Sequence, residues 1–157
     1  YEIMPSLVGS EMCIRDRRRI VMKLTMFKSK LHQMVVTEAN LMYEGSITID
    51  QDLLDKAQLL SYEKVQVLNI TNGQRLETYT IPGERGSRVC CLNGAAARFT
   101  QVGDRIIVIA YAEMTPEEAR THQPRVVVVD EHNNPKTILD YSQPTTTYSL
   151  ETGLNVK

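Results

Sequence analysis

The feature that most constrains the fold lies in the middle of the chain, where residues 64–81 predict a β-hairpin. Residues 64–70 begin with strict alternation of polar and apolar side chains, which is the period of a half-buried strand. Asn72 and Gly73 follow, and this pair supplies the two positive-φ residues of a tight hairpin turn. A second strand is therefore expected through residues 74–81, which commits this part of the chain to antiparallel β structure.

Short strands and small helices are expected on both sides of the hairpin. Strands are predicted over residues 23–37, 47–49, 88–92, 106–111 and 125–130, the fourth as a buried strand and the fifth as the last. A loop is predicted over residues 82–87, and a turn entering a short helix over residues 93–97. Because no strand–helix unit repeats, the pattern favours a compact, mainly β barrel with short helices over a doubly wound sheet.

Two further helices are also predicted. Asp50 is placed to cap a helix over residues 51–60. This helix has four apolar side chains at helical spacing that would cover the core, Leu53, Leu54, Ala57 and Leu60. The second helix begins at Thr115 and Pro116, with Glu118 at its third position, which is a capping-box pattern.

Composition restricts the class of protein. The 157 residues, 42% of them hydrophobic and 24% charged, suffice for one ordinary core. The net charge of -1 argues against nucleic acid as a partner, and no apolar run is long enough to span a membrane. Cys90 and Cys91 are adjacent and, with Cys13, make an odd number of cysteines, so a structural disulfide is not expected. A reducing cytoplasm fits best.

The two ends of the chain differ from the middle. Residues 1–21 lack strand or helix periodicity, and residues 5–17 resemble translated sequencing-adapter sequence, so we expect a non-native extension with Met22 as the natural start. The alternative is a genuine disordered extension. Residues 139–157 are rich in Ser and Thr, which predicts a flexible C-terminal tail.

Several common site types do not match the sequence. It contains no phosphate-binding loop and no glycine-rich dinucleotide fingerprint, and its three histidines lack metal-ligand spacing. Cys90 or Cys91 paired with a histidine is conceivable as a nucleophile. Two small apolar residues in a strand are the favoured interpretation of that pair.

The Gly45-Ser46 dipeptide is distinguished from Gly9-Ser10 and Gly86-Ser87 by its surroundings. Six segments are informative together, namely residues 28–32, 43–46, 49–52, 71–73, 84–88 and 93–97. In this order they resemble the pyruvoyl-dependent aspartate 1-decarboxylase family, from about Met22 to Pro124, whereas the chain after Pro124 matches poorly. The resemblance implies one decarboxylase domain over residues 22–138 with a double-psi β-barrel fold and a homotetrameric assembly.

The resemblance also implies that the chain cuts itself between Gly45 and Ser46. Ser46 Oγ would attack the Gly45 carbonyl, for which glycine leaves room, with Thr78 assisting. Elimination and hydrolysis would then leave a covalent pyruvoyl group at position 46. This group takes the place of pyridoxal phosphate, and no metal is implied. Cleavage by the chain alone and cleavage helped by a maturation factor are both compatible with the sequence.

The implied reaction converts L-aspartate to β-alanine and carbon dioxide through a Schiff base, for pantothenate biosynthesis. Tyr79 would be the proton donor in this reaction. The implied substrate-binding residues include two cations for carboxylates, one threonine and a turn with accessible backbone donors, namely Arg75, Lys30, Thr78, Asn93, Gly94, Ala95 and Ala96. An unprocessed β-barrel interaction module and a pyruvoyl decarboxylase of another amino acid are the alternatives.

Strand geometry conflicts with a single shared pocket. Alternation places Arg75 and Tyr79 on one face of their strand and Thr78 on the other. Two explanations are available. Either a twist or bulge near the strand end redirects a side chain, or the pocket lies between subunits so that both faces contribute to neighbouring sites.

Overall fold

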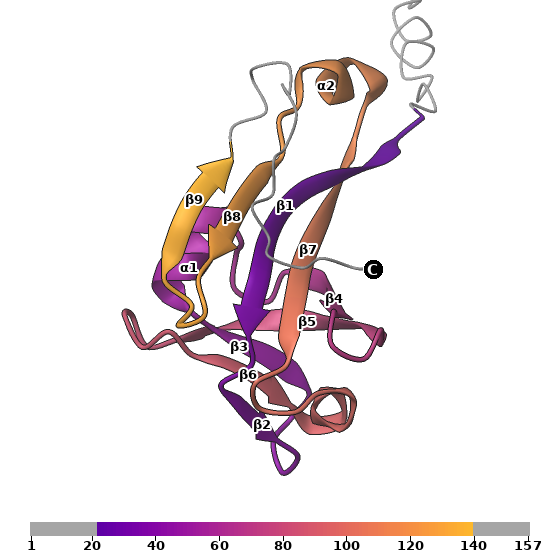
Figure 1. Ribbon diagram of the computed structural model, residues 1–157. Helices are drawn as coiled ribbons and strands as arrows, with labels where there is room; N and C mark the ends of the chain where they lie inside the picture. Colours follow the sequence, from indigo (N-terminus) through magenta and orange to yellow (C-terminus); the bar gives the residue numbers. More distant parts are fainter. Residues whose placement is uncertain (1–21, 140–157) are drawn as a thin grey trace, which may run out of the picture.

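The computed structural model describes residues 22–139, which form a mixed nine-stranded sheet in the order β2-β6-β3-β5-β4-β7-β1-β8-β9 (Figure 1). The strands are β1 (Leu24–Val35), β2 (Glu38–Asn40), β3 (Ser46–Asp50), β4 (Lys64–Asn69), β5 (Arg75–Gly83), β6 (Cys90–Asn93), β7 (Arg105–Met114), β8 (Arg125–Val129) and β9 (Pro135–Leu139). The helices are α1 (Gln51–Ala57), the 3₁₀ helix η1 (Gly94–Phe99) and α2 (Pro116–Thr121). The mainly β fold class predicted from the sequence is confirmed.

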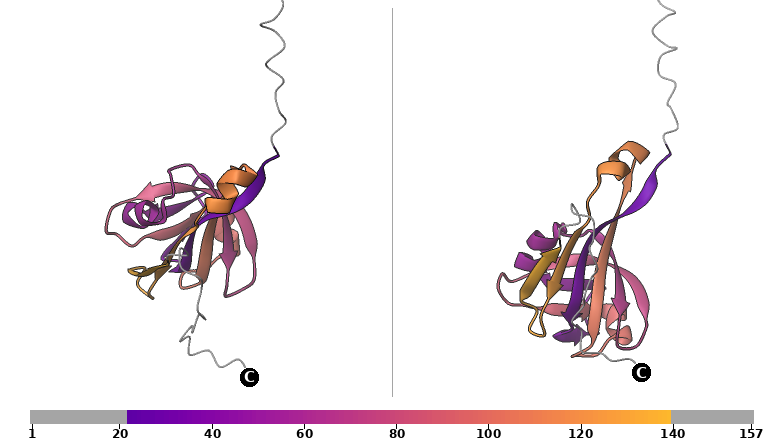
Figure 2. Two further views of the ribbon diagram at one scale, coloured as in Figure 1. Left: turned by 90° about the horizontal axis from the view of Figure 1, so that it is seen from above. Right: turned by 45° about the horizontal axis from the view of Figure 1, so that its top comes forward.

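The long strands β1 and β7 pair antiparallel and extend beyond the rest of the sheet toward α2 (Figure 2). The capping box predicted for α2 is present, because the Thr115 side chain accepts from the Glu118 N–H and the Glu118 carboxylate accepts from the Thr115 N–H. On its other edge β1 pairs in parallel with β8. Neither α-helix within residues 22–139 is long and apolar enough to cross a membrane.

The core is built from alternating positions of the strands. In β7, Ile106, Val108 and Ala110 are buried, whereas Ile107 and Ile109 are only partly covered. The buried strand predicted over residues 106–111 is thus buried on one face and partly open on the other. Leu53, Leu54 and Ala57 of α1 are wholly buried as predicted.

The hairpin between β4 and β5 forms, but its turn differs from the prediction. The connection covers residues 70–74, and only Gly73 has positive φ, at 78°. The Asn69 carboxamide oxygen accepts from the N–H groups of Thr71 and Asn72, and Gly73 N–H donates to the Asn69 carbonyl. Two bonds to the Asn69 side chain and one to its carbonyl therefore hold a longer turn in place of the two-residue turn.

Helix α1 is shorter than expected. Asp50 caps it as predicted, its carboxylate accepting from Asp52 N–H at 2.8 Å. The helix ends at Ala57 because Gln58 adopts the left-handed conformation, with φ 55°. Leu60 then lies outside the helix and is 71% exposed, so its assignment to the core-facing set is wrong. Helical spacing alone cannot show where a chain leaves the helix.

The strands also differ from the prediction in their number and in their ends. β2 and β9 were not predicted, so the strand over residues 125–130 is not the last. β5 continues through Pro82 to Gly83, inside the predicted loop. Pro82 is tolerated there because its backbone nitrogen need not donate to the ladder. The expectations for residues 1–21 and for the tail beyond residue 139 lie outside the described residues.

Candidate active site

The candidate site is centred on the antiparallel pair β3 and β6, where Ser46 is opposite Asn93 and Thr48 is opposite Cys91. Alternation divides this pair into two faces. One face contributes Ile47, Ile49, Cys90 and Leu92 to the hydrophobic core. The other face carries four polar side chains, which we call the polar quartet: Ser46, Thr48, Cys91 and Asn93.

The Asn93 carboxamide connects the whole quartet. Its Nδ2 donates to Ser46 Oγ and to Thr48 Oγ1, each at 2.9 Å. Its Oδ1 accepts from the Cys91 thiol at 3.2 Å. Ser46 is wholly buried and Asn93 is 3% exposed, so the hydrogen bond between these two side chains is shielded from water. The Ser46 hydroxyl therefore occupies a dry, polar and well-defined position.

The chain changes from exposed to buried at the Gly45-Ser46 bond. Residues 41–45 are exposed, whereas Ser46 is fully covered. Gly94, with φ 59°, lies against the backbone just before this bond, and a Cβ placed there would be 2.7 Å from the Tyr43 carbonyl oxygen and 2.9 Å from Gly45 Cα. Only glycine permits this approach. The start of η1 therefore packs closely against the backbone of Tyr43 and Gly45, directly before the bond that the sequence predicts to be cut.

β5 lies on the other side of β3 and runs parallel to it, with Ile47 paired to Thr80. Counting back from this pair, Ser46 is level with Tyr79 and Gly45 is level with Thr78. Tyr79 shares the face of the polar quartet and is 38% exposed, whereas Thr78 is partly buried on the core side. The ladder between β3 and β5 itself begins at Ile47 and Thr80, so these two alignments are an extension of its register.

Arg75 is exposed and shares the face of Tyr79, but it lies four residues before Tyr79 in β5, a separation of roughly 13 Å at the usual rise of a strand. Pairing of β4 with β5 runs from Arg75 to Tyr79 without a register shift. A bulge in this part of β5 therefore does not explain how Thr78 could share a pocket with Arg75 and Tyr79, which lie on the opposite face of the strand. Thr78 points away from Arg75 and Tyr79 in the described chain.

Lys30 is on β1, and the sheet order places β5, β4 and β7 between β1 and β3. The described chain therefore does not bring Lys30 to Ser46 along the sheet. Its Nζ lies 5.6 Å from the centre of the Phe27 ring, and burial lowers the pKa of this lysine. Burial and then the Lys30 charge lower the pKa of the nearby His32. Lys30 is thus a partly desolvated cation.

The remaining predicted residues lie at the start of η1. Ala95 is exposed and Ala96 is buried, directly after Gly94. Within residues 22–139, no cluster of three His, Cys, Asp or Glu side chains could hold a metal ion.

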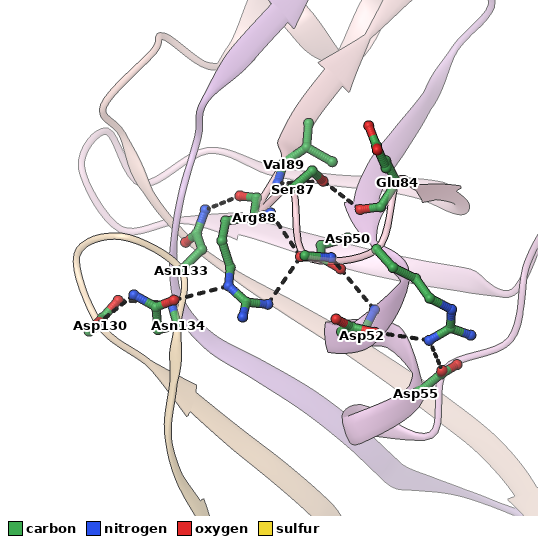
Figure 3. A network of polar contacts seen from close by, with 12 residues as sticks. Asp50, Asp52, Asp55, Glu84, Ser87, Arg88, Val89, Asp130, Asn133 and Asn134 are labelled. Carbon is green, nitrogen blue, oxygen red and sulfur yellow. Dashed lines mark hydrogen bonds and ion pairs between the residues drawn. The ribbon is translucent and has the colours of Figure 1, made fainter.

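A buried carboxylate fixes the far ends of β3 and β6. Asp50 is wholly buried and accepts from the N–H groups of Asp52, Gly86 and Arg88 and from the Arg88 guanidinium (Figure 3). Burial alone would raise the pKa of Asp50, but these backbone donors and the Arg88 charge outweigh it and hold the pKa below its usual value. Arg88 has positive φ, 60°, and its carbonyl accepts from Asn133. This network attaches the loop before β6 to α1 and to the β8–β9 turn.

Sequence reasoning missed Thr48 and Cys91. A usable signal was present, because each is two residues from a predicted site residue in a strand, Thr48 from Ser46 and Cys91 from Asn93. Interpreting Cys90 and Cys91 together as apolar strand residues concealed that they lie on opposite faces.

The fold and the site together define a small, mainly β domain in which a buried serine directly follows an exposed glycine and accepts a hydrogen bond from an asparagine. The comparisons identify the family. The profile described as Aspartate decarboxylase matches residues 22–136, beyond the Pro124 limit of the resemblance, and the chain belongs to this family, whose fold is the double-psi β-barrel.

Curated relatives agree with this assignment. An Aspartate 1-decarboxylase of Salinibacter ruber is 67% identical over 113 residues, which cover 72% of this chain and 77% of the relative. One from Desulfitobacterium hafniense is 64% identical over 111 residues, covering 71% of this chain and 87% of the relative. One from Clostridium kluyveri is 55% identical over 122 residues, covering 78% of this chain and 96% of the relative.

Proposed function

We propose that this chain is a self-processing aspartate 1-decarboxylase, which converts L-aspartate to β-alanine and carbon dioxide and so supplies pantothenate biosynthesis. The observation that carries the proposal is the buried Ser46 hydroxyl, held by Asn93 directly after a glycine on which Gly94 closes. Membership of the aspartate decarboxylase family supports the choice of reaction. Cytoplasmic location and a maturation factor stay predictions.

In the proposed cleavage, Ser46 Oγ forms a bond to the Gly45 carbonyl carbon and the Gly45–Ser46 amide bond breaks. The hydroxyl proton passes to the departing nitrogen, so an ester replaces the amide without any co-reactant. Loss of the Ser46 Cα proton then breaks the Cβ–Oγ bond. Gly45 is released as a carboxylate, and position 46 becomes dehydroalanine. Water converts this residue to the pyruvoyl group and releases ammonia.

Two side chains support the first step from opposite faces of the sheet. Asn93 Nδ2 donates to Ser46 Oγ, which favours negative charge on the attacking oxygen. Thr78, level with Gly45 on β5, is the proposed donor to the oxyanion that forms on the Gly45 carbonyl. For cleavage, Thr78 need not share a face with Tyr79, because Asn93 would assist the Ser46 hydroxyl from one face of the sheet and Thr78 the Gly45 carbonyl from the other.

The surroundings of Ser46 fit the group it would become. The position is dry, and Asn93 and Thr48 offer polar atoms on its own face of the sheet. Asn93 would hold the group. When formed, a pyruvoyl group withdraws electrons from a bound amino acid and so makes loss of its carboxylate easier.

The other proposed residues bind aspartate and move its proton. Tyr79, level with Ser46 and partly open to solvent, is the proposed proton donor to the substrate. Arg75 would hold the side-chain carboxylate with two parallel hydrogen bonds. The start of η1, at Ala95 and Ala96, would offer backbone donors.

We place the complete site between subunits of a homotetramer. Lys30 and Ser46 are separated by three strands in one chain, so Lys30 would serve a neighbouring chain's site. The exposure of Arg75 and Tyr79 in one chain supports this arrangement, because a neighbour can then cover them.

Mass spectrometry of the intact purified protein tests the proposal. The expected result is two chains, one ending at Gly45 and one beginning with a ketone at position 46. Ser46→Ala should stay uncut and release no carbon dioxide from aspartate. A wild-type chain that stays whole under maturation conditions, or a cleaved chain that decarboxylates glutamate better than aspartate, would contradict the proposal.

A further inference from the structure

The Cys91 thiol is part of the polar quartet but has no role in the proposed chemistry. We propose that Cys91 is a positioning residue, which fixes the orientation of the Asn93 carboxamide so that its Nδ2 rather than its Oδ1 faces Ser46. The inference rests on the proposed self-cleavage. It concerns one contact, the Cys91 Sγ to Asn93 Oδ1 hydrogen bond of 3.2 Å.

An asparagine carboxamide can fill the same space in two orientations, related by exchange of its oxygen and nitrogen. The two hydroxyls of the quartet do not select between them. Ser46 and Thr48 can each accept from Nδ2, as they do here, or each donate to Oδ1 after a flip. The remaining neighbour of the carboxamide must therefore decide its orientation.

The Cys91 thiol provides that selection. Burial, and then the charge of Glu38, raise the pKa of this thiol, so it keeps its proton and donates. Sulfur accepts only weakly, so a flipped carboxamide would point its N–H at a poor acceptor. The Leu92 carbonyl, at 3.8 Å from Sγ, is a more distant acceptor than Asn93 Oδ1 at 3.2 Å.

Orientation matters because the two arrangements affect the serine oxygen in opposite ways. With Nδ2 toward it, Ser46 Oγ receives a donor that stabilises the negative charge developing as it attacks Gly45. With Oδ1 toward it, the hydroxyl proton would be held by a carbonyl that is too weak a base to remove it. The thiol thus favours the reactive arrangement without contacting the bond that breaks.

The neighbouring cysteine offers a matched control. Cys90 is in the same strand, but its side chain is wholly buried in the hydrophobic core on the opposite face. Cys90→Ala removes the same sulfur atom from the same strand and leaves the Asn93 contacts in place. Any effect common to both variants reflects loosened packing rather than a lost donor.

The test is the rate at which freshly made precursor is cut, followed by intact mass. Cys91→Ala should slow cleavage about five- to tenfold, the effect of one hydrogen bond. Cys91→Ser keeps a donor and should stay within about twofold of wild type, as should Cys90→Ala. Wild-type cleavage in Cys91→Ala overturns the inference. So does equal slowing in Cys91→Ala and Cys91→Ser, or in Cys91→Ala and Cys90→Ala.

If the wild-type chain is never cut, the proposed function fails and the orientation is tested directly on the intact chain. Asparagine-selective ¹⁵N labelling reports the Nδ2 protons, and the Asn93 signals are assigned by their loss in Asn93→Ala. Both protons should exchange slowly with solvent in wild type and faster in Cys91→Ala. Unchanged exchange in Cys91→Ala overturns the inference.

Discussion

Gly94 lies too close for any side chain to the backbone just before the bond proposed to break. A methyl group at Gly94 would meet backbone atoms at 2.7 and 2.9 Å, and backbone cannot move aside as a flexible side chain can. We therefore expect Gly94→Ala to slow self-cleavage by about tenfold or more, because a small displacement of reacting atoms is costly. Intact mass against time measures this.

The control is Gly103→Ala. Gly103 has φ 93° and no atom within 4 Å of an added Cβ, so it incurs backbone strain alone, about 1–2 kcal/mol. Equal cleavage rates in the two variants would show that the close approach at Gly94 does not matter.

Tyr79 separates the two proposed reactions. Its hydroxyl is assigned to the decarboxylation and not to the cleavage, and its side chain is partly exposed. Tyr79→Phe should be cut at the wild-type rate, whereas release of β-alanine should fall about a hundredfold or more, as expected for a lost general acid. Normal decarboxylation by the cut variant would exclude Tyr79 as proton donor.

At the scale of elements, sequence patterns predicted the strands better than their ends and connections. Alternation located β4, and the Asp50 and Thr115 caps were both correct. The type of turn predicted after β4 was wrong, because the Asn69 side chain forms hydrogen bonds to the turn that the local sequence pattern does not reveal. β2 was missed because it is short and exposed, and its strand character depends on pairing with β6.

In the candidate site too, single residues were predicted but their contacts were not. Ser46 and Asn93 were found through the family resemblance, but their direct contact depends on the register of β3 against β6. That register is a long-range property, which the order of residues does not specify alone.

Asp50 makes the stability of the folded chain depend on pH, through the network at the far end of β3 and β6. Its pKa in the folded chain is below the ordinary 3.8, so its stabilisation is complete above that value and is lost as pH falls through the lower folded pKa. Asp50→Asn should cost about 2 kcal/mol near neutral pH, since bonds to a charged acceptor are weakened.

Thermal unfolding across pH measures this effect. The difference in Tm between wild type and Asp50→Asn should be constant near neutrality and shrink below about pH 4. Asp55→Asn, which alters an exposed partner of Arg85, is the control and should change Tm less. A difference that does not depend on pH would show that Asp50 does not act through its charge.

For the whole molecule, the position of Lys30 is the observation that one chain does not explain. Lys30 on β1 and Arg75 on β5 both belong to the proposed aspartate pocket, yet β7 and β4 lie between their strands. If the pocket forms between subunits, one chain supplies Lys30 and its neighbour supplies Arg75. The sequence alone does not reveal which chain supplies each residue, because residues of a shared site need not be close in any one chain.

This arrangement predicts complementation between two inactive variants. Lys30→Ala and Arg75→Ala should each be cut normally and each fail to decarboxylate aspartate. In mixed tetramers, a site that takes Lys30 from the Arg75→Ala chain and Arg75 from the Lys30→Ala chain is intact. About a quarter of sites in a random mixture should then be active, as symmetry requires. β-Alanine release by the coexpressed pair measures this. A pair as inactive as its parents would place both residues in the same chain's site, because no combination could then restore them.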